Sequence, residues 1–211
     1  MMPPMKLTDG IYKVDRVGIS NAYLVVTDEG LVAVDTGMPG NAARICSYIE
    51  GLGRPATDLR LIVLTHCDID HIGSAARLKQ LTGAAVAVHE LDGPVVAGRS
   101  KPVKGGRVMA ALYRLLRFKP VEPDLLLRDG QTIAGLRVVH VPGHTPGSIV
   151  LTRGDGVVFS GDALLGDGKG RIRPPDPRLA FDRAQAQLSA GRIRALPMTL
   201  LLPGHGQPVH D

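Results

Sequence analysis

The sequence predicts an α/β protein of one domain, and three observations lead to this fold class. Short apolar runs recur along the chain, which is typical of buried strands. The order of elements is similar in the two halves: strands joined by tight turns come first, and a strand, a turn and a helix follow. The 211 residues, 44% of them hydrophobic, can also bury one sizeable core.

In the first half, apolar runs mark five strands, at residues 11–17, 22–27, 31–35, 61–64 and 84–88. The segment Asp28-Glu29-Gly30 is typical of a hairpin turn between the second and third strands. A helix is expected from a cap at Asn41 to about Leu52, because apolar residues recur there on one helical face. A second helix should cover residues 73–81 and end at Gly83.

Residues 91–123 interrupt this rhythm with glycines and prolines. Inside the segment, apolar residues have helical spacing among Arg107, Arg114 and Arg117; they are Val108, Leu112, Leu115 and Leu116. We expect an insertion with one amphipathic, basic helix. It forms a packed surface helix, a lid or substrate wall, or a membrane-surface helix. Tyr113 on this helix either lines a pocket or packs against the core.

In the second half, strands are expected at residues 125–127, 136–141, 149–152, 157–160 and 199–202. Residues 154–156 should form a turn and residues 166–177 a loop rich in glycine, proline and charge. A helix is expected over residues 179–193.

Composition narrows the classes of function. Aromatic residues are scarce, at 3% with no Trp, which argues against a stacking platform for single-stranded nucleic acid. The net charge of +5 is spread along the chain and indicates a solvated basic face, although it would favour anionic substrates. Two cysteines, Cys46 and Cys67, are too few for a disulfide framework. No apolar run approaches the ~20 residues of a membrane span, and the N-terminus lacks a signal pattern. We therefore expect a cytoplasmic protein with a small-molecule substrate and no nucleic-acid or membrane partner, which acts alone or as a homodimer.

The candidate site begins with the turn from Thr65 to Gly73, between an expected core strand and an expected helix. It carries four side chains that bind metals in proteins, namely His66, Asp68, Asp70 and His71. Such a turn is a rigid place for a site. An alternative is that Asp68 or Asp70 caps the helix and the histidines lie on the surface.

Three later turns repeat this design, each directly after an expected strand. They carry His144, Asp162 and His205, and glycine or proline shapes each turn. If these strand ends meet at one edge of a sheet sandwich, four loops deliver seven nitrogen and oxygen ligands to one place. The repetition favours a metal site over surface residues. The remaining histidines, His89, His140 and His210, are expected to be structural or solvated.

In order and spacing these residues resemble the metallo-β-lactamase superfamily, with the motif His66-Cys67-Asp68-Ile69-Asp70-His71 followed by His144, Asp162 and His205. The early Asp35-Thr36-Gly37 resembles the structural Asp-x-Gly turn of that family. The resemblance extends from about Ile11 to Pro208. It implies a four-layer αβ/βα sandwich in a single domain of residues 1–211, with residues 91–123 as the insertion.

The resemblance also implies two divalent metal ions, Zn²⁺ first and Mn²⁺ or Fe as alternatives. His66, Asp68 and His144 would hold one ion, and Asp70, His71 and His205 the other, with Asp162 as a bridge. Two such ions can hold a bridging hydroxide that attacks a carbonyl or phosphoryl centre. Asp70 would be the catalytic residue, because it can orient that hydroxide or carry its proton.

Asp68 departs from the family pattern, which usually has a histidine at this position. With Asp68, Asp70, Asp162 and a hydroxide, the charge of two divalent ions is neutralised. We therefore expect a less electrophilic centre with more tolerance of hard ions such as Mn²⁺ or Fe.

The segment Gly161-Asp162-Ala163-Leu164 resembles the glyoxalase II and lactonase branches, whereas familiar zinc β-lactamases carry a cysteine in place of Asp162. Glyoxalase II proper has a C-terminal helical domain, for which the residues after His205 leave no room, and the insertion is short for an RNA-gripping arm. We therefore expect a metal-dependent hydrolase of an ester, thioester or lactone. The alternative is a mono-iron redox or sensor protein of the same fold, similar to persulfide dioxygenases.

Overall fold

Two β-sheets face each other in the computed structural model, which describes residues 5–102, 111, 113–116 and 118–210. The first sheet has the strand order β1 to β7, with bounds Met5–Thr8, Ile11–Val14, Ala22–Thr27, Gly30–Val34, Leu59–Leu64, Ala85–His89 and Leu125–Leu127. The second has the order β15-β14-β11-β10-β9-β8, with bounds Val209–His210, Leu200–Pro203, Val157–Gly161, Ile149–Thr152, Leu136–His140 and Thr132–Ile133. A short pair beside it joins β12 (Leu165–Gly166) to β13 (Ile172–Arg173).

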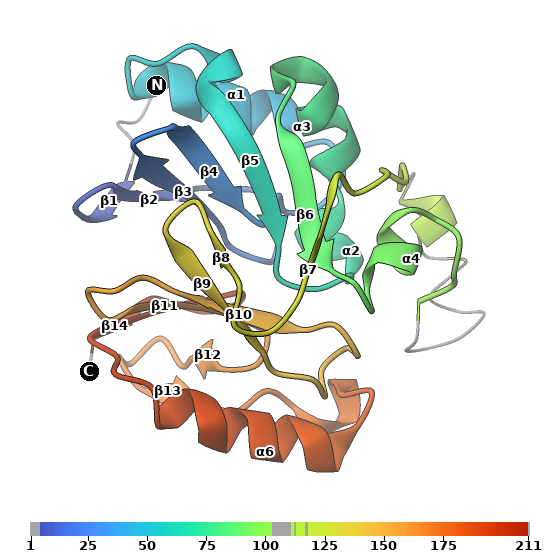
Figure 1. Ribbon diagram of the computed structural model, residues 1–211, viewed down its shortest axis with the longest axis vertical. Coiled ribbons are helices and arrows are strands. Elements are labelled where there is room, and N and C mark those ends of the chain that lie inside the picture. The colour runs from blue at the N-terminus through green and yellow to red at the C-terminus, as the bar shows by residue number, and fades with distance from the viewer. Residues whose placement is uncertain (1–4, 103–110, 112, 117, 211) are drawn as a thin grey trace.

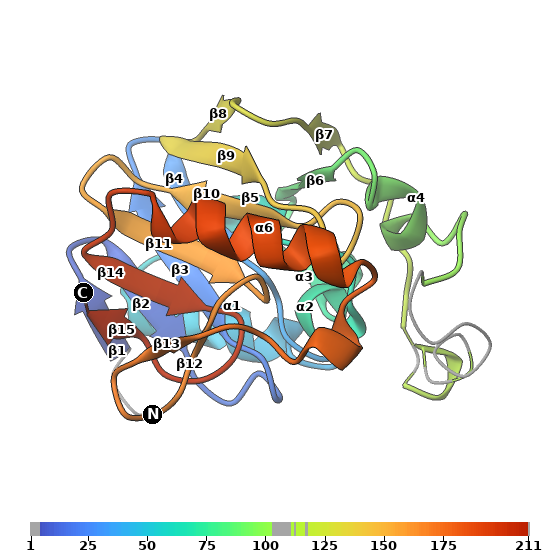
Figure 2. The same ribbon diagram turned by 90° about the horizontal axis from the view of Figure 1, so that it is seen from below.

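Helices cover the two outer faces of the sheets. Helices α1 (Ala42–Gly51) and α3 (Ala75–Thr82) lie on the first sheet, and α6 (Arg183–Arg194) runs across the second (Figure 1, Figure 2). Two one-turn helices, α2 (Ile69–Ile72) and α4 (Gly93–Val96), follow β5 and β6. The layers are thus helix, sheet, sheet and helix, which confirms the expected sandwich.

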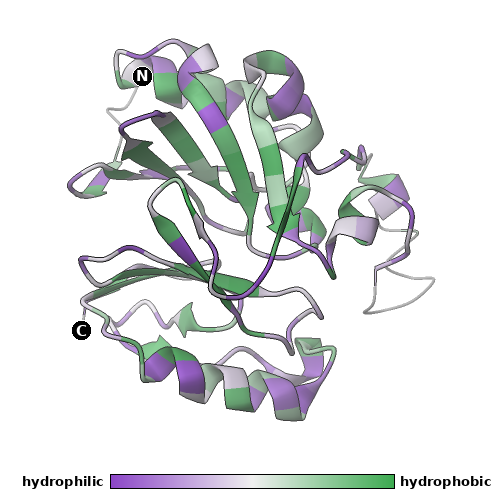
Figure 3. Ribbon diagram, viewed as in Figure 1, coloured by the Kyte–Doolittle hydropathy of each residue, from purple (hydrophilic) through white to green (hydrophobic). Residues whose placement is uncertain are grey.

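Three apolar clusters fill the spaces between these four layers. Side chains alternate between clusters along each central strand, because successive residues of a strand point to opposite faces. In β5, Ile62 contacts the cluster under α1 and α3, while Val63 contacts the cluster between the sheets. In β11, Phe159 lies between the sheets and Val158 lies under α6. Where both faces of a strand are buried its residues are mostly apolar, as Figure 3 shows, and the charged Arg60 of β5 is exposed.

The strand directions bring the candidate loops together at one edge. Strands β4, β5 and β6 are parallel, so their carboxyl ends share one edge of the first sheet. Strands β11 and β14 are also parallel in the second sheet. Three hydrogen bonds join the sheets at this edge: Ile149 N to Thr65 O at 2.9 Å, Asn21 N to Gly204 O at 2.7 Å, and Tyr23 Oη to Pro203 O at 2.7 Å.

Local details differ from the sequence-based expectations. The expected helix at residues 179–193 begins only at Arg183, because the Asp182 side chain accepts a hydrogen bond from Gln185 N and caps it there. The segment Pro177–Leu179 is a separate 3₁₀ turn. Asn41 precedes α1 without capping it, since its amide donates to the carbonyls of Val17 and Met38 at 2.9 Å. The very short strands β1, β8, β12, β13 and β15, the 3₁₀ turn Ala56–Asp58 and the one-turn helices have no clear sequence signal.

The expected amphipathic helix of the insertion depends on Arg107, Val108, Leu112 and Arg117, which lie outside the described residues. Its role as a lid or substrate wall therefore stays a prediction, as does the single domain of residues 1–211. Within the described part of the chain, no helix is both long and apolar enough to cross a membrane. The cytoplasmic location stays a prediction from the sequence.

Candidate metal centre

All seven candidate ligands lie at the edge where the two sheets meet. His66 follows β5, the acidic pair and His71 lie in or beside α2, and His144 lies in the loop from β9 to β10. Asp162 follows β11, and His205 follows β14. Four loops that are distant in sequence therefore place their side chains in one cluster.

One group of ligands consists of His66, Asp68 and His144, whose ligand atoms lie within 4.8 Å of one another. Asp68 Oδ2 is 3.0 Å from His144 Nε2 and 3.7 Å from His66 Nε2. Asp68 stands at the N-cap position of α2, but its side chain makes no capping hydrogen bond. The alternative role of Asp68 as a helix cap is therefore wrong, because the carboxylate faces the two imidazoles instead.

A second group consists of Asp70, His71 and His205. His205 Nε2 lies 3.2 Å from Asp70 Oδ2 and 3.4 Å from His71 Nε2. Asp162 lies between the two groups: its Oδ2 is 3.4 Å from both His144 Nε2 and His205 Nε2. Its Oδ1 is 3.4 Å from His71 Nε2.

The donor atoms of this cluster fit a bound cation. Among the described residues, His66 Nε2 and Asp162 Oδ1 are buried and have no hydrogen-bond partner. Leaving such polar atoms unpaired in the interior is costly, so native structures satisfy them with a partner, water or an ion. Two imidazole Nε2 atoms about 3.4 Å apart, as in His71 and His205, are a further sign that an ion belongs between them.

Hydrogen bonds to the Nδ1 atoms orient three of the imidazoles. Asp35, directly after β4, accepts from His71 Nδ1, Thr65 N and Thr65 Oγ1, each at 2.8 Å. Because the Thr65 hydroxyl donates to Asp35, it accepts from His66 Nδ1 at 3.0 Å. His205 Nδ1 donates to the carbonyl of Ile19 at 2.9 Å. In the neutral form of each of these rings the proton is thus held on Nδ1, and Nε2 faces the cluster.

The electrostatics of the cluster reflect close packing of opposite charges. Burial opposes protonation of His71 and His205, but Asp162 and neighbouring carboxylates raise the pKa of His71 to about 9 and that of His205 to about 10. Burial and the neighbouring His71 hold the pKa of His66 well below its usual range. Despite burial, the surrounding imidazoles hold the pKa of Asp162 well below its usual range. A bound cation would take the place of the protons on Nε2.

The remaining histidines, the two cysteines and Tyr113 do not belong to these groups. His89 and His140 stack on each other with ring centroids 4.0 Å apart. Cys46 and Cys67 are buried in the apolar cluster under α1 and α3. Tyr113 is buried, and its hydroxyl donates to the backbone carbonyl of Cys67, in the turn of the candidate ligands, rather than lining a described pocket.

The structure also reveals residues that carry no signal in the sequence. Asp92 is 1% exposed, and its carboxylate accepts hydrogen bonds from Cys67 N, Thr145 Oγ1 and Gly147 N. Ser20 Oγ donates to the backbone carbonyl of Asp70. These contacts depend on which loops meet in space, so no local sequence pattern points to them.

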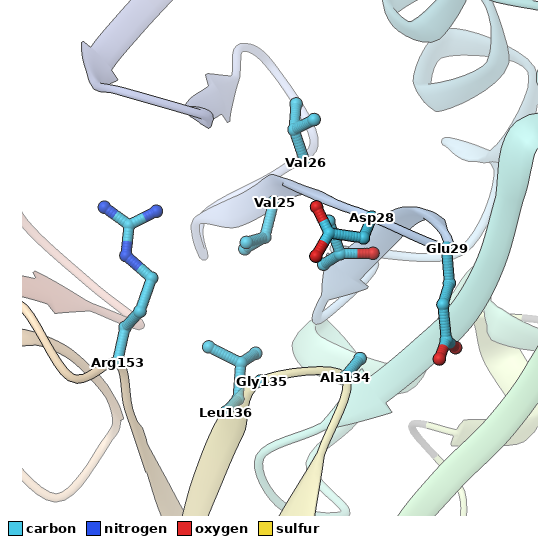
Figure 4. A pocket seen from close by; sticks show the side chains of 9 residues that line it. Val25, Val26, Asp28, Glu29, Ala134, Gly135, Leu136 and Arg153 are labelled. Carbon is cyan, nitrogen blue, oxygen red and sulfur yellow. The ribbon is translucent and has the colours of Figure 1, made fainter.

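A cavity of about 380 Å³ lies at the opposite edge of the sandwich (Figure 4). It is lined by the hairpin between β3 and β4, by residues 134–136, and by Arg153. Asp28 and Glu29 lie on one side of it and the Arg153 guanidinium on the other. The candidate ligands follow the other ends of the strands, so this cavity is separate from the cluster.

The comparisons with known proteins agree with this geometry. The family model for the Metallo-beta-lactamase superfamily matches residues 15–205. The chain is 32% identical over 197 residues to the hydroxyacylglutathione hydrolase GloC of Haemophilus influenzae, covering 88% of this chain and 85% of GloC. It is 27% identical over 218 residues to the probable metallo-hydrolase YflN of Bacillus subtilis, covering 92% and 83%. The crystal structure of BJP-1, a subclass B3 metallo-beta-lactamase of Bradyrhizobium japonicum, aligns with a TM-score of 0.73 and 28% identity, covering 97% and 78%.

The chain therefore belongs to the metallo-β-lactamase superfamily, as its motifs indicate. It is a metal-dependent hydrolytic enzyme, because relatives named as hydrolases match it over most of their length and its own His and Asp groups can hold metal.

Proposed function

We propose that this enzyme uses two divalent metal ions, Zn²⁺ first, to hydrolyse a carbonyl ester, with a thioester as the leading substrate and oxygen esters and lactones as further candidates. The observation that carries the proposal is the pair of ligand groups with Asp162 between them. A carboxylate within 3.4 Å of imidazoles from both groups is suited to bridge two cations.

The ligands indicate which metals fit. His66, Asp68 and His144 would hold the first ion and Asp70, His71 and His205 the second, a mixture of imidazole and carboxylate that suits Zn²⁺, Mn²⁺ or Fe. Ions bound there supply Lewis-acid charge for a carbonyl oxygen and lower the pKa of a water toward neutrality.

The Asp70 carboxylate is suited to orient the attacking water and to accept its proton. Although burial opposes ionisation, the hydrogen bond with His205 holds the pKa of Asp70 below its usual value. The Asp70 carboxylate therefore stays ionised at neutral pH, and it can accept a hydrogen bond from the attacking water and orient it. Ser20 holds the Asp70 backbone, which limits how far this carboxylate can turn.

Two exposed apolar residues are hydrogen-bonded through their backbone to ligand residues, which supports an acyl substrate. Ile19 is 74% exposed, and its carbonyl accepts the hydrogen bond from His205. Phe181 is 54% exposed, and its N–H donates to the carbonyl of His144 at 3.2 Å. An apolar acyl group could bury surface against these exposed side chains while its carbonyl reaches the centre.

The relatives order the substrates to be tested. GloC is named a hydroxyacylglutathione hydrolase, and this chain matches it over 85% of its length. A 2-hydroxyacyl thioester therefore comes first. BJP-1 is named a metallo-beta-lactamase, so a β-lactam belongs on the same panel.

The test combines metal analysis with a substrate panel. Purified protein loaded with Zn²⁺ or Mn²⁺ is assayed with hydroxyacyl thioesters, aryl esters, lactones, phosphodiesters and a β-lactam. We expect two metals per chain and thioester turnover. An Asp162→Ala variant should lose metal and at least about 100-fold in kcat/KM, since it removes the shared ligand. Asp155→Ala, which breaks the surface pair with Arg153, is the matched control and should keep both.

The proposal would be refuted if fully loaded protein turned over no substrate of the panel while Asp162→Ala matched the wild type in metal content.

A second candidate function follows from the first ligand group by itself. His66, Asp68 and His144 form a set of two histidines and one carboxylate, which is typical of non-haem iron sites. One Fe per chain together with oxygen uptake would favour a mono-iron redox protein, whereas two Zn or Mn favour the hydrolase.

A further inference from the structure

Asp92 joins the two loops that carry the first ligand group. It lies at the start of α4, yet its side chain makes no capping bond to that helix. Its Oδ2 accepts from Cys67 N at 3.0 Å and from Thr145 Oγ1 at 2.6 Å, and its Oδ1 accepts from Gly147 N at 2.8 Å. Cys67 stands between His66 and Asp68, and Thr145 follows His144. One buried carboxylate thus bonds the neighbours of all three ligands.

The contact with the loop after His144 is close and built for this carboxylate. A Cβ on Gly147 would lie 2.6 Å from Asp92 Cγ, so only glycine allows the backbone to approach this far. Thr145 is also held by Ser148, whose Oγ accepts from Thr145 N at 2.9 Å and lies 2.8 Å from Thr145 Oγ1. The loop is therefore cross-linked to Asp92 and to itself.

Tyr113 holds the same turn from the insertion side. Its hydroxyl donates to the Cys67 carbonyl at 2.8 Å, and its side chain is 6% exposed. The ring lies edge-on to Phe118, with centroids 5.3 Å apart. The backbone of Cys67 is thus gripped at both polar atoms, at N–H by Asp92 and at C=O by Tyr113.

We infer that Asp92 and Tyr113 are positioning residues that fix the turn of His66 and Asp68 relative to His144. They thereby set the affinity of the first ligand group for its metal ion. The inference rests on the proposed metal centre. Both oxygens of Asp92 are occupied by backbone or hydroxyl donors, so the residue acts through the ligand loops and is not itself a ligand. Metal ligands must be held within about 0.5 Å of productive geometry, and buried hydrogen bonds to their backbone do this. The insertion would thereby help to position the ligands, because its Tyr113 is hydrogen-bonded to the turn that carries them.

Two conservative variants of the full chain test this. In Asp92→Asn an amide –NH₂ replaces one oxygen and faces an N–H donor, either of Cys67 or of Gly147. In Tyr113→Phe only the hydroxyl is lost. Metal-free protein is titrated with Zn²⁺ in the presence of a competing chelator. A second titration uses Co²⁺, whose binding is followed by visible absorption. We expect one of two binding steps to weaken about 10- to 100-fold in Asp92→Asn and several-fold in Tyr113→Phe, with the other step changed less than about threefold. The Co²⁺ spectrum of the weakened site should change in band position.

Asp124→Asn is the matched control. Asp124 also accepts a backbone hydrogen bond, from Val86 N at 2.7 Å, but it lies at the opposite end of β6. It should lower the thermal midpoint and leave both binding steps unchanged. Asp35→Asn should weaken both steps, because Asp35 holds His71 directly and holds His66 through the Thr65 hydroxyl.

The outcomes separate this inference from the proposed function. Native metal affinities and an unchanged Co²⁺ spectrum in both Asp92→Asn and Tyr113→Phe would overturn it, even if the variants were less stable and the wild type were an active hydrolase. Selective loss of one step would support it, even if the wild type hydrolysed none of the panel. A wild-type chain that bound no metal would overturn both.

Discussion

Replacement of Asp68 by histidine tests how the charge of the centre sets its chemistry. The Asp68 carboxylate is 18% exposed and lies 3.0 Å from His144 Nε2, inside a group whose ligand atoms are all within 4.8 Å. The substitution removes one negative charge and leaves a ligand nitrogen. A unit charge about 5 Å from a titrating group contributes about 3 kcal/mol at an effective dielectric constant of ~20, or about two pH units. Partial exposure reduces this, so we expect a shift of about one unit.

The sign follows from the loss of one negative charge, which favours the deprotonated form of the attacking water. The acid limb of kcat/KM for the Zn²⁺-loaded enzyme should therefore move to lower pH by about one unit. The preference for Zn²⁺ over Mn²⁺ should also rise, because imidazole is a softer ligand than carboxylate. The assay is a pH–rate profile with the best substrate of the panel, together with competitive metal binding. Asp176→His, on the surface and paired with Arg178, is the matched control. An acid limb and a metal preference both equal to those of the wild type would refute the reasoning.

Three further predictions concern stability. Asp35→Asn leaves three buried donors facing a single amide oxygen, so urea unfolding should show a loss of about 2–4 kcal/mol; a loss below about 0.5 kcal/mol would contradict this. Gly161→Ala puts a Cβ 2.7 Å from Thr65 Oγ1 at a φ of +49°, and should cost about 2–4 kcal/mol. Gly130→Ala, with φ +79° and open space around it, should cost only about 1 kcal/mol in the same assay, and equal losses would argue against the steric explanation. Burial and the neighbouring imidazole lower the pKa of His89 to about 4, so the unfolded chain binds more protons there between pH 6.5 and 4 and stability falls as pH falls through this window. His89→Phe should remove about 2 kcal/mol of that fall between pH 7 and pH 5, whereas parallel pH–stability curves would disprove it.

The architecture was largely predictable from the sequence, because its signals are local. Continuous apolar runs such as Leu61–Leu64 arise when both faces of a strand are buried, and β5 has apolar clusters on each side. The ends of helices were less predictable, because they depend on single contacts. Helix α6 begins four residues later than the apolar pattern predicts, because the Asp182 side chain caps its first turn. Strands of two residues, such as β8 and β15, exist only through pairing with their neighbours and leave no pattern.

The sequence by itself determined which side chains could form the centre. His66, Asp70 and the later histidines each follow a core strand. The end of a strand and the turn after it can be recognised from a few consecutive residues. Only the tertiary structure decided how these groups meet: that Asp68 faces His144 and does not cap a helix, and that Asp162 lies between both groups. It alone revealed Asp92, and it alone showed that Asp92 and Tyr113 hold Cys67 across 25 and 46 residues of sequence. The physical reason is one of range. Side-chain periodicity and turn chemistry act over a few residues, whereas hydrogen bonds between loops depend on the register and stacking of two whole sheets.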